Sequence, residues 1–118
     1  GYDEIEIYGA TGGRLDHFFA VMCLLEKYQY IKLKVIDQQN CIQLLKPGKH
    51  YIYNQGYYYF SLFALNESIL SISQAEYTLD HYLLKRDDPL CVSNEVKGEY
   101  TIIENNENII LVQSRDAQ

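Results

Sequence analysis

The chain has 118 residues, of which 47% are apolar, and this is enough to bury the core of one compact domain or of two small lobes. Its 16 acidic residues outnumber its 10 basic residues, and the net charge of −6 disfavours nucleic acid and anionic membranes as partners, because both select for a basic face. No apolar run approaches the ~20 residues of a membrane-spanning helix, so we expect no membrane segment.

The first part of the chain is predicted to form a strand, a helix and a second strand. Residues 4–8 alternate polar and apolar side chains and stop at Gly9, which indicates a short strand that enters a glycine turn. Apolar residues then recur at helical spacing over 15–28, and residues 31–36 alternate again. This order is typical of a parallel α/β sheet, which needs further strands and cover on both faces. We therefore expect the rest of the sheet to precede Gly1.

Beyond Asn40 the helical period disappears, and short apolar runs are separated by turn residues such as Pro47-Gly48. The strands predicted there are 41–46, 50–54, 57–65, 69–73, 89–96, 99–104 and 108–113. Several short strands at about this spacing favour an antiparallel sandwich or barrel. The predicted fold is thus mixed α/β plus all-β, with a remnant of a parallel α/β domain in residues 1–43 and an antiparallel β-sandwich in 44–118.

The three cysteines, Cys23, Cys41 and Cys91, are far apart, odd in number and outside any CxxC pair. A disulfide framework has more cysteines in an even number, so we expect buried free thiols in a reducing compartment. This interpretation predicts a cytoplasmic protein.

The most informative motif is the run GATGGRLDH at residues 9–17, between the first strand and the helix. A glycine turn at a helix N-terminus can direct backbone N–H groups at an anion, so Gly12 and Gly13 are candidate phosphate-binding residues. Arg14 can clamp phosphate oxygens with its planar guanidinium, and Asp16 can hold a metal ion, a hydroxyl or an amine. The plainer alternative is a tight turn with Asp16 as a helix-start charge, and the residues alone do not decide between the two.

A second motif is the run RDDPLCVSNE at residues 86–95. Ser93 and Asn94 are small hydrogen-bonding residues that can contact the polar edges of a heterocycle, although the residues alone favour a strand that runs into a turn. Tyr77 can stack on a ring, but a tyrosine in a β domain more often belongs to the core.

The direction of these side chains follows from the predicted strand. In an alternating strand Leu90 and Val92 share one face and are the better core candidates. This places Ser93 on a less buried surface and Asn94 at the strand end, so we expect both at the mouth of a pocket and away from the core.

These motifs together resemble the thiamine pyrophosphokinase family. The run at 9–17 is similar to that family's GGR-hydrophobic-Asp-His/Gln signature, and VIDQQN at 35–40 resembles the end of its bacterial catalytic domain. Pro47-Gly48 resembles the turn that opens its thiamine-binding domain, LCVSNE at 90–95 its LCISNE-type strand, and IILV at 109–112 its last strand. Landmarks in the family's order along nearly the whole chain are more specific than any one of them.

The resemblance implies an enzyme that transfers pyrophosphate from ATP to the thiamine hydroxyl and gives thiamine diphosphate and AMP, with Mg²⁺ as cofactor. It implies that residues 1–43 complete the α/β catalytic domain and that residues 44–118 bind thiamine. It also implies a homodimer with thiamine between domains at the subunit interface.

The resemblance assigns roles to seven residues of this chain. Arg14 and Asp16 become catalytic residues, and Gly12, Gly13 and Arg14 become the ATP phosphate site. The thiamine-binding residues are then Ser93, Asn94 and Tyr77.

The sequence departs from the family pattern around Tyr77, where QAEYTL stands in place of a glycine-aromatic-lysine-tyrosine-proline-leucine pattern. The family's acidic metal-binding segments lie upstream of its GGR motif, so we expect the main Mg²⁺ ligands upstream of Gly1 and expect this chain alone to be inactive. The alternatives are a small-ligand-binding module without catalysis and a dimerisation module.

Overall fold

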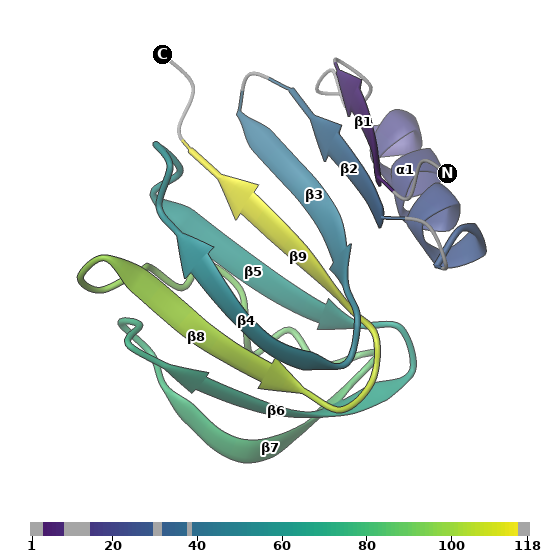
Figure 1. Ribbon diagram of the computed structural model, residues 1–118. Helices are drawn as coiled ribbons and strands as arrows, with labels where there is room; N and C mark the ends of the chain where they lie inside the picture. Colours follow the sequence, from purple (N-terminus) through teal and green to yellow (C-terminus); the bar gives the residue numbers. More distant parts are fainter. Residues whose placement is uncertain (1–3, 9–14, 30–31, 38, 116–118) are drawn as a thin grey trace.

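The computed structural model describes residues 4–8, 15–29, 32–37 and 39–115 (Figure 1). Within them the chain forms β1 (Glu4–Tyr8), α1 (Leu15–Lys27), β2 (Lys32–Ile36), β3 (Asn40–Leu45), β4 (Gly48–Tyr53), β5 (Tyr59–Ala64), β6 (Glu67–Ser73), β7 (Leu79–Lys85), β8 (Tyr100–Asn105) and β9 (Ile109–Ser114). In these ranges no helix has both the length and the apolar character needed to cross a membrane.

The strand-helix-strand unit predicted at the start of the chain is present. β1 and β2 pair in parallel from Glu4 with Lys32 to Tyr8 with Ile36, which confirms the parallel α/β unit. Leu33 and Val35 of β2 pack with the buried residues of α1, because alternate strand positions point to the same face of the sheet.

The strands form two sheets that are mostly antiparallel. One has the order β1-β2-β3-β9-β5, and the other has the order β4-β8-β6-β7 (Figure 1). Only β1 and β2 among these described strands pair in parallel. The expected boundary between residues 43 and 44 falls within β3, whose sheet also contains β2 and β9, and the domain division stays a prediction.

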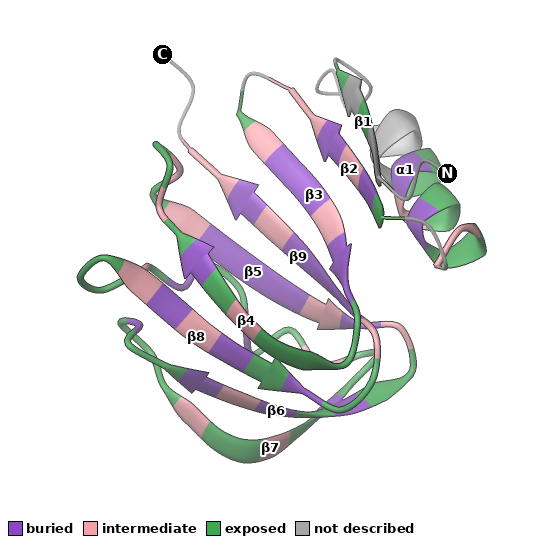
Figure 2. Ribbon diagram, viewed as in Figure 1, coloured by how far each residue is buried: buried purple, intermediate pink, exposed green. Residues whose placement is uncertain are grey.

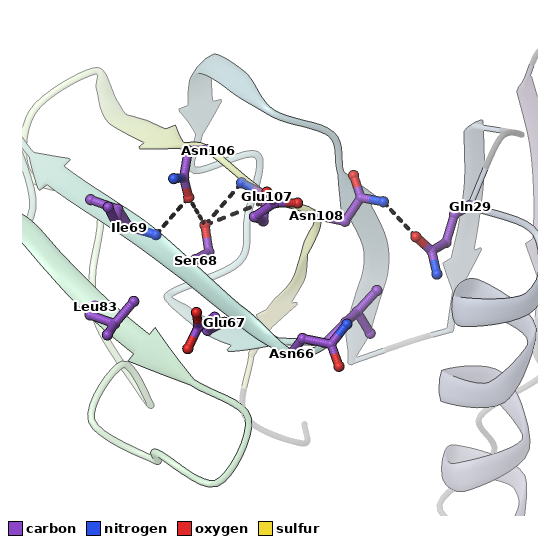
Figure 3. A pocket seen from close by; sticks show the side chains of 10 residues that line it. Gln29, Asn66, Glu67, Ser68, Ile69, Leu83, Asn106, Glu107 and Asn108 are labelled. Atoms are coloured by element: carbon purple, nitrogen blue, oxygen red, sulfur yellow. Dashed lines mark hydrogen bonds between the residues drawn. The ribbon is translucent and has the colours of Figure 1, made fainter.

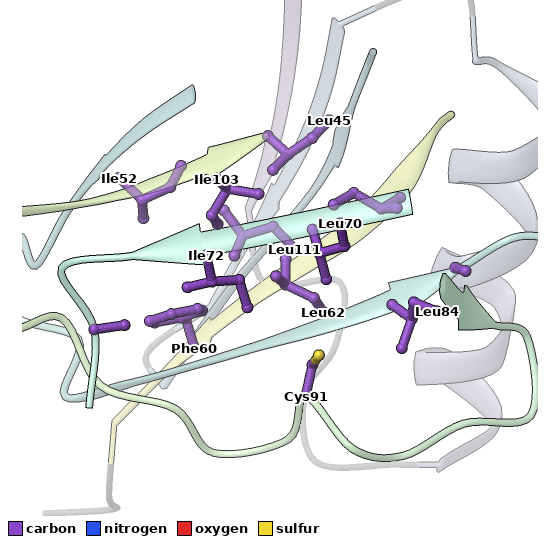
Figure 4. Packing of buried hydrophobic residues seen from close by; sticks show 13 residues of the cluster. Leu45, Ile52, Phe60, Leu62, Leu70, Ile72, Leu84, Cys91, Ile103 and Leu111 are labelled. Atoms are coloured by element: carbon purple, nitrogen blue, oxygen red, sulfur yellow. The ribbon is translucent and has the colours of Figure 1, made fainter. Parts of the chain in front are cut away.

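One hydrophobic core joins the two sheets. Figure 4 shows side chains of both sheets in a single cluster, among them Phe60 and Leu62 of β5, Leu70 of β6 and Ile103 of β8. These four side chains are almost completely buried, and the buried positions recur along the strands of Figure 2. A smaller cluster fills the space between the first sheet and α1.

The strand predicted at 89–96 is wrong, and β7 takes its place in the second sheet. β7 lacks strict alternation because Ile72 pairs with Leu79 whereas Leu70 pairs with Tyr82, so β7 carries one extra residue. His81, in this bulge, has a left-handed φ of 52° and donates its backbone N–H to Ser71 Oγ at 2.9 Å. The bulge thus hides β7 from a search for period-two patterns.

The expectation of three buried free thiols holds for Cys41 and Cys91 but is wrong for Cys23. All three cysteines are free, but Cys23 is exposed. It lies on α1 two residues from both Val21 and Leu25, and a helix turns about 200° over two residues, which places Cys23 on the outer face.

Candidate functional site

A pocket of about 470 Å³ opens beside the end of β6 and the turn that follows β7. Its lining consists of Ile72, Tyr77, Leu79, Leu90, Cys91, Val92, Ser93 and Asn94. Tyr77, Ser93 and Asn94, which come from two separate segments, therefore lie around one pocket.

Backbone pairing holds these two segments together. Glu76 N donates to Glu95 O at 2.9 Å, and Lys97 N donates to Gln74 O at 3.1 Å. Asn94 also exchanges two backbone hydrogen bonds of 2.8 Å with Phe60 of β5. The pocket wall is thus tied directly to a core strand, which makes it a preformed feature of the fold.

Asn94 fastens Tyr77 to the pocket. Asn94 Oδ1 accepts the backbone N–H groups of Tyr77 and Glu95, both at 2.9 Å, and Nδ2 donates to Tyr77 O at 2.7 Å. The residue is only 3% exposed, so the expectation that Asn94 lies at the pocket mouth is wrong. Its amide satisfies the backbone of a neighbouring segment, and such a group can be buried at little cost.

Tyr77 and Ser93 form the mouth of the pocket. The Tyr77 side chain is 66% exposed although its backbone is held at both ends by Asn94. Ser93 is exposed as expected, has a left-handed φ of 61° and donates its N–H to Ser61 Oγ at 3.0 Å. An aromatic ring and a hydroxyl are therefore presented to solvent from a fixed backbone.

The prediction that Leu90 and Val92 belong to the core is wrong. They are 56% and 45% exposed, whereas Cys91 between them is buried. Asp88 Oδ1 accepts the Leu90 N–H at 2.9 Å and thereby closes a turn at this point. Leu62 N donates to Cys91 O at 2.9 Å and holds the segment against β5. In this position Cys91 is buried, and Leu90 and Val92 are exposed, which is the reverse of the predicted arrangement. Leu90 and Val92 become apolar walls of the pocket, a role that the alternating pattern concealed.

Cys91 lies at the floor of the pocket as an un-ionised thiol. Burial, followed by the nearby Asp88 carboxylate, raises the pKa of Cys91 to about 11. A thiol is nucleophilic as its thiolate, so Cys91 is unsuited to nucleophilic catalysis near neutral pH. Asp88 also accepts the hydroxyl hydrogen of Tyr82, and this hydrogen bond raises the pKa of Tyr82.

The composition of the pocket suits binding better than covalent chemistry. Four of its eight lining residues are aliphatic, and the others supply one thiol, one exposed phenol ring, one hydroxyl and one amide. None of the lining residues is a carboxylate, lysine, arginine or histidine. Apolar walls with a few oriented polar groups are typical of sites for small organic ligands. In the described part of the chain, no group of three or more His, Cys, Asp or Glu is placed to hold a metal ion.

The predicted phosphate and catalytic residues cannot be placed in the same way. Gly12, Gly13 and Arg14 lie outside the described residues, between the end of β1 and the start of α1. Asp16 lies in the first turn of α1, but its side chain is not described. The roles of these four residues stay predictions.

A second hollow, of about 350 Å³, lies where β6 and the β8–β9 loop approach the end of α1 (Figure 3). Its polar groups bond to one another: Ser68 Oγ donates to Asn106 Oδ1 at 3.3 Å and accepts the Glu107 N–H at 3.2 Å. Asn108 Nδ2 donates to Gln29 Oε1 at 2.6 Å. These hydrogen bonds join the β8–β9 loop to β6 and to the segment that follows α1, and a structural role accounts for the polar residues of the hollow.

A parallel strand-helix-strand unit and two mostly antiparallel sheets define the chain as an α/β and β protein, and the pocket beside Tyr77 is its candidate site for a small organic ligand. Residues 49–110 match the family described as thiamin pyrophosphokinase, vitamin B1 binding domain. The match covers more than half of the chain and includes Tyr77, Ser93 and Asn94. The chain belongs to this family.

Named relatives agree with the family match. The chain is 34% identical over 122 residues to the thiamine pyrophosphokinase of Bacillus subtilis (strain 168), which covers 97% of this chain and 56% of the relative. The crystal structure of thiamine pyrophosphokinase from Bacillus subtilis superposes with a TM-score of 0.87 at 32% identity, over 98% of this chain and 57% of that one. The enzyme from Geobacillus thermodenitrificans gives a TM-score of 0.84 at 30% identity, over 97% and 55%. The chain thus spans a little more than half the length of these relatives.

Proposed function

We propose that this chain is the thiamine-binding part of a thiamine pyrophosphokinase. The observation that carries the proposal is the convergence of Tyr77, Ser93 and Asn94 on one pocket inside the segment that matches the vitamin B1 binding family. Tyr77 and Asn94 are 17 positions apart in the sequence and meet at this pocket through hydrogen bonds of the Asn94 amide. The resemblance of the sequence to the family assigns Tyr77, Ser93 and Asn94 to thiamine.

The pocket offers each part of a flat cationic heterocycle a matching contact. The exposed Tyr77 ring can stack on an aromatic ring or lie over a thiazolium, since a cation is attracted to the face of a phenol. Leu90 and Val92 supply apolar walls, and the Ser93 hydroxyl can donate or accept a hydrogen bond at the mouth. Asn94 contributes by fixing Tyr77, because its buried amide bonds to both the N–H and the C=O of Tyr77.

The proposed reaction of the whole enzyme is pyrophosphoryl transfer. The thiamine hydroxyl oxygen forms a bond to the β-phosphorus of ATP, the bond from that phosphorus to the bridging oxygen of the α-phosphate breaks, and AMP leaves while the hydroxyl proton is released. Arg14 would neutralise charge on the transferred phosphates, Gly12 and Gly13 would donate backbone N–H groups to them, and Asp16 would orient a reactant.

Several finer features belong to the same proposal. Mg²⁺ would accompany ATP and neutralise its phosphates, but the described residues do not form a metal site, so its ligands are expected in the part of the relatives that this chain does not span. The two sheets share one core, which supports a β-sandwich for residues 44–118. A homodimer in the cytoplasm remains part of the proposal.

Calorimetric titration of the 118-residue chain with thiamine tests the binding proposal. We expect Tyr77→Ala and Ser93→Ala to weaken thiamine binding, with about 0.5–1.5 kcal/mol lost for the serine hydrogen bond. Tyr58→Ala is a matched control, because Tyr58 is 58% exposed but does not line the pocket. Equal affinities for all three variants and the parent chain would contradict the proposal, whereas binding without AMP release would identify the chain as the binding part only.

The glycine turn is tested in the full-length enzyme. Arg14→Ala should lower the rate of pyrophosphoryl transfer, because a preorganised donor to transition-state charge is worth about 2–4 kcal/mol. Ser93→Ala should raise KM for thiamine and leave KM for ATP nearly unchanged. Unchanged kcat and KM for ATP in Arg14→Ala would reduce Arg14 to a helix-start residue.

A further inference from the structure

A groove beside the edge of the second sheet collects positive charge. It has a volume of about 670 Å³ and lies between β2, β3 and the edge strand β4. Lys32, Lys34, Lys46 and Lys49 line it, and none of its lining residues is an aspartate or glutamate. Four of the ten lysines and arginines of a chain with a net charge of −6 thus lie around one hollow.

The strand pattern explains why these lysines meet. Leu33 and Val35 of β2 are buried against α1, so Lys32 and Lys34 point from the opposite face of the sheet. Lys34 pairs with Gln43 of β3, which also lines the groove. β4 is the last strand of the second sheet, and it brings Lys49 to the facing wall.

Three lysines of the groove form no ion pair with a described residue. Lys32, Lys34 and Lys49 take part in neither of the ion pairs found within the described ranges, which are His81 with Asp80 and Lys97 with Glu76. Glu6 of β1 is the register partner of Lys34 and offsets part of its charge, whereas no acidic residue lines the groove itself. The Lys49 ammonium instead lies 5.8 Å from the ring centre of Tyr51. Several ammonium groups along one concave surface repel one another and focus a positive potential into the hollow, and a bound polyanion relieves that repulsion.

The groove also offers neutral hydrogen-bond donors beside the charges. The amide of Gln43 and the phenol of Tyr51 both line it, and amide and phenol groups can donate to phosphate oxygens. The volume is within the range of about 300–1,000 Å³ that is usual for small-molecule sites. Lys32 is the first residue of β2 and Lys34 is its middle residue.

We propose that this groove is a binding site for a small molecule with two or more linked phosphate groups, such as inorganic pyrophosphate or a nucleoside polyphosphate. The site shares no lining residue with the thiamine pocket, and it does not depend on the function proposed above. The lysines bind the phosphates by charge, and Gln43 and Tyr51 hydrogen-bond to their oxygens.

Titration of the 118-residue chain with inorganic pyrophosphate, ATP and adenosine, without added metal, tests this site. We expect pyrophosphate and ATP to bind and adenosine not to bind, because the lysines recognise phosphate charge. The double variant Lys32→Gln/Lys34→Gln should weaken binding about tenfold or more, and a rise in salt from about 50 to 200 mM should weaken binding to the parent chain, since screening shortens the reach of surface charges.

Two control variants distinguish the groove from the remaining cationic residues of the chain. Lys85→Gln/Lys97→Gln removes the same charge elsewhere and should keep at least half of the affinity. Arg14→Ala removes the arginine of the glycine turn, and in that background Lys32→Gln/Lys34→Gln should still weaken pyrophosphate binding about tenfold or more. No binding of either phosphate compound, equal weakening in both double variants, or loss only in Arg14→Ala would overturn the proposal. Thiamine affinity should be unchanged in Lys32→Gln/Lys34→Gln, so failure of this site and failure of the thiamine pocket give different results.

Discussion

Replacing Asn94 with alanine is expected to destabilise the whole fold as well as the pocket. The substitution removes hydrogen bonds of 2.9, 2.9 and 2.7 Å and leaves the N–H and C=O of Tyr77 and the N–H of Glu95 without their partner. A hydrogen bond contributes about 0.5–1.5 kcal/mol net, so three of them predict a loss of about 1.5–4.5 kcal/mol in the free energy of unfolding. Because Asn94 is only 3% exposed, water cannot easily replace the lost amide.

Urea unfolding followed by far-ultraviolet circular dichroism measures this loss. The neighbouring Ser93→Ala is the matched control: the Ser93 side chain is exposed, and its change should stay within about 0.5 kcal/mol. Asn94→Asp keeps an oxygen for the two N–H groups but cannot donate to Tyr77 O as a carboxylate, so it should also destabilise. If Asn94→Ala is as stable as Ser93→Ala, the amide does not hold the two segments together.

Three further predictions concern the thiols and the backbone. At pH 8 a disulfide reagent should modify Cys23 rapidly and should modify Cys41 and Cys91 only after unfolding. Those two thiols are buried, and burial raises the pKa of both. Fast reaction of more than one thiol would contradict this prediction. The folded state raises the pKa of the Cys91 thiol from 9.0 to about 11, so the protonated thiol favours the folded state below pH 9. This contribution should be lost as pH rises towards about 11. The urea midpoint should therefore fall less over this range in Cys91→Ala than in the parent chain. At His81, with its φ of 52°, valine should cost about 1–2 kcal/mol and glycine should be neutral or stabilising in thermal melts; equal melting temperatures would remove the bulge as a source of backbone strain.

Local patterns in the sequence predict the parts of the fold that local geometry determines. The alternation in residues 4–8 and 31–36 and the helical spacing between them predict β1, α1 and β2, and the parallel pairing is confirmed. The antiparallel strands before Ser73 are likewise present close to their predicted ranges.

The errors arise where a distant contact decides the local structure. β7 escapes prediction because the extra residue at Asp80-His81 interrupts its alternation, and the bulge depends on the partner strand β6. The run at 90–95 has a strand-like composition but does not form a continuous strand. The Asp88 carboxylate accepts the Leu90 N–H and closes a turn, and Ser93 has a positive φ that interrupts the extended backbone. This turn exchanges the predicted facing of Leu90 and Cys91.

The sequence names three of the eight residues that line the candidate site, but it does not predict how the site is built. The resemblance to a family selects Tyr77, Ser93 and Asn94, and the structure places all three around one pocket. The part that Asn94 plays as a buried clamp on Tyr77 depends on a contact across 17 residues, and no local pattern reports such a contact. The lysine groove escapes prediction for the same reason, since its lysines come from strands of different sheets.

The most direct test of the thiamine pocket is a map of backbone amide chemical shifts during titration of the isotope-labelled chain with thiamine. Binding in the proposed pocket predicts the largest shifts at Tyr77 and at residues 90–94, which line it, and smaller shifts in β4 and in the lysine groove. The absence of saturable shifts, or shifts centred on residues 32–34 and 46–53 instead, would contradict the assignment of this pocket to thiamine.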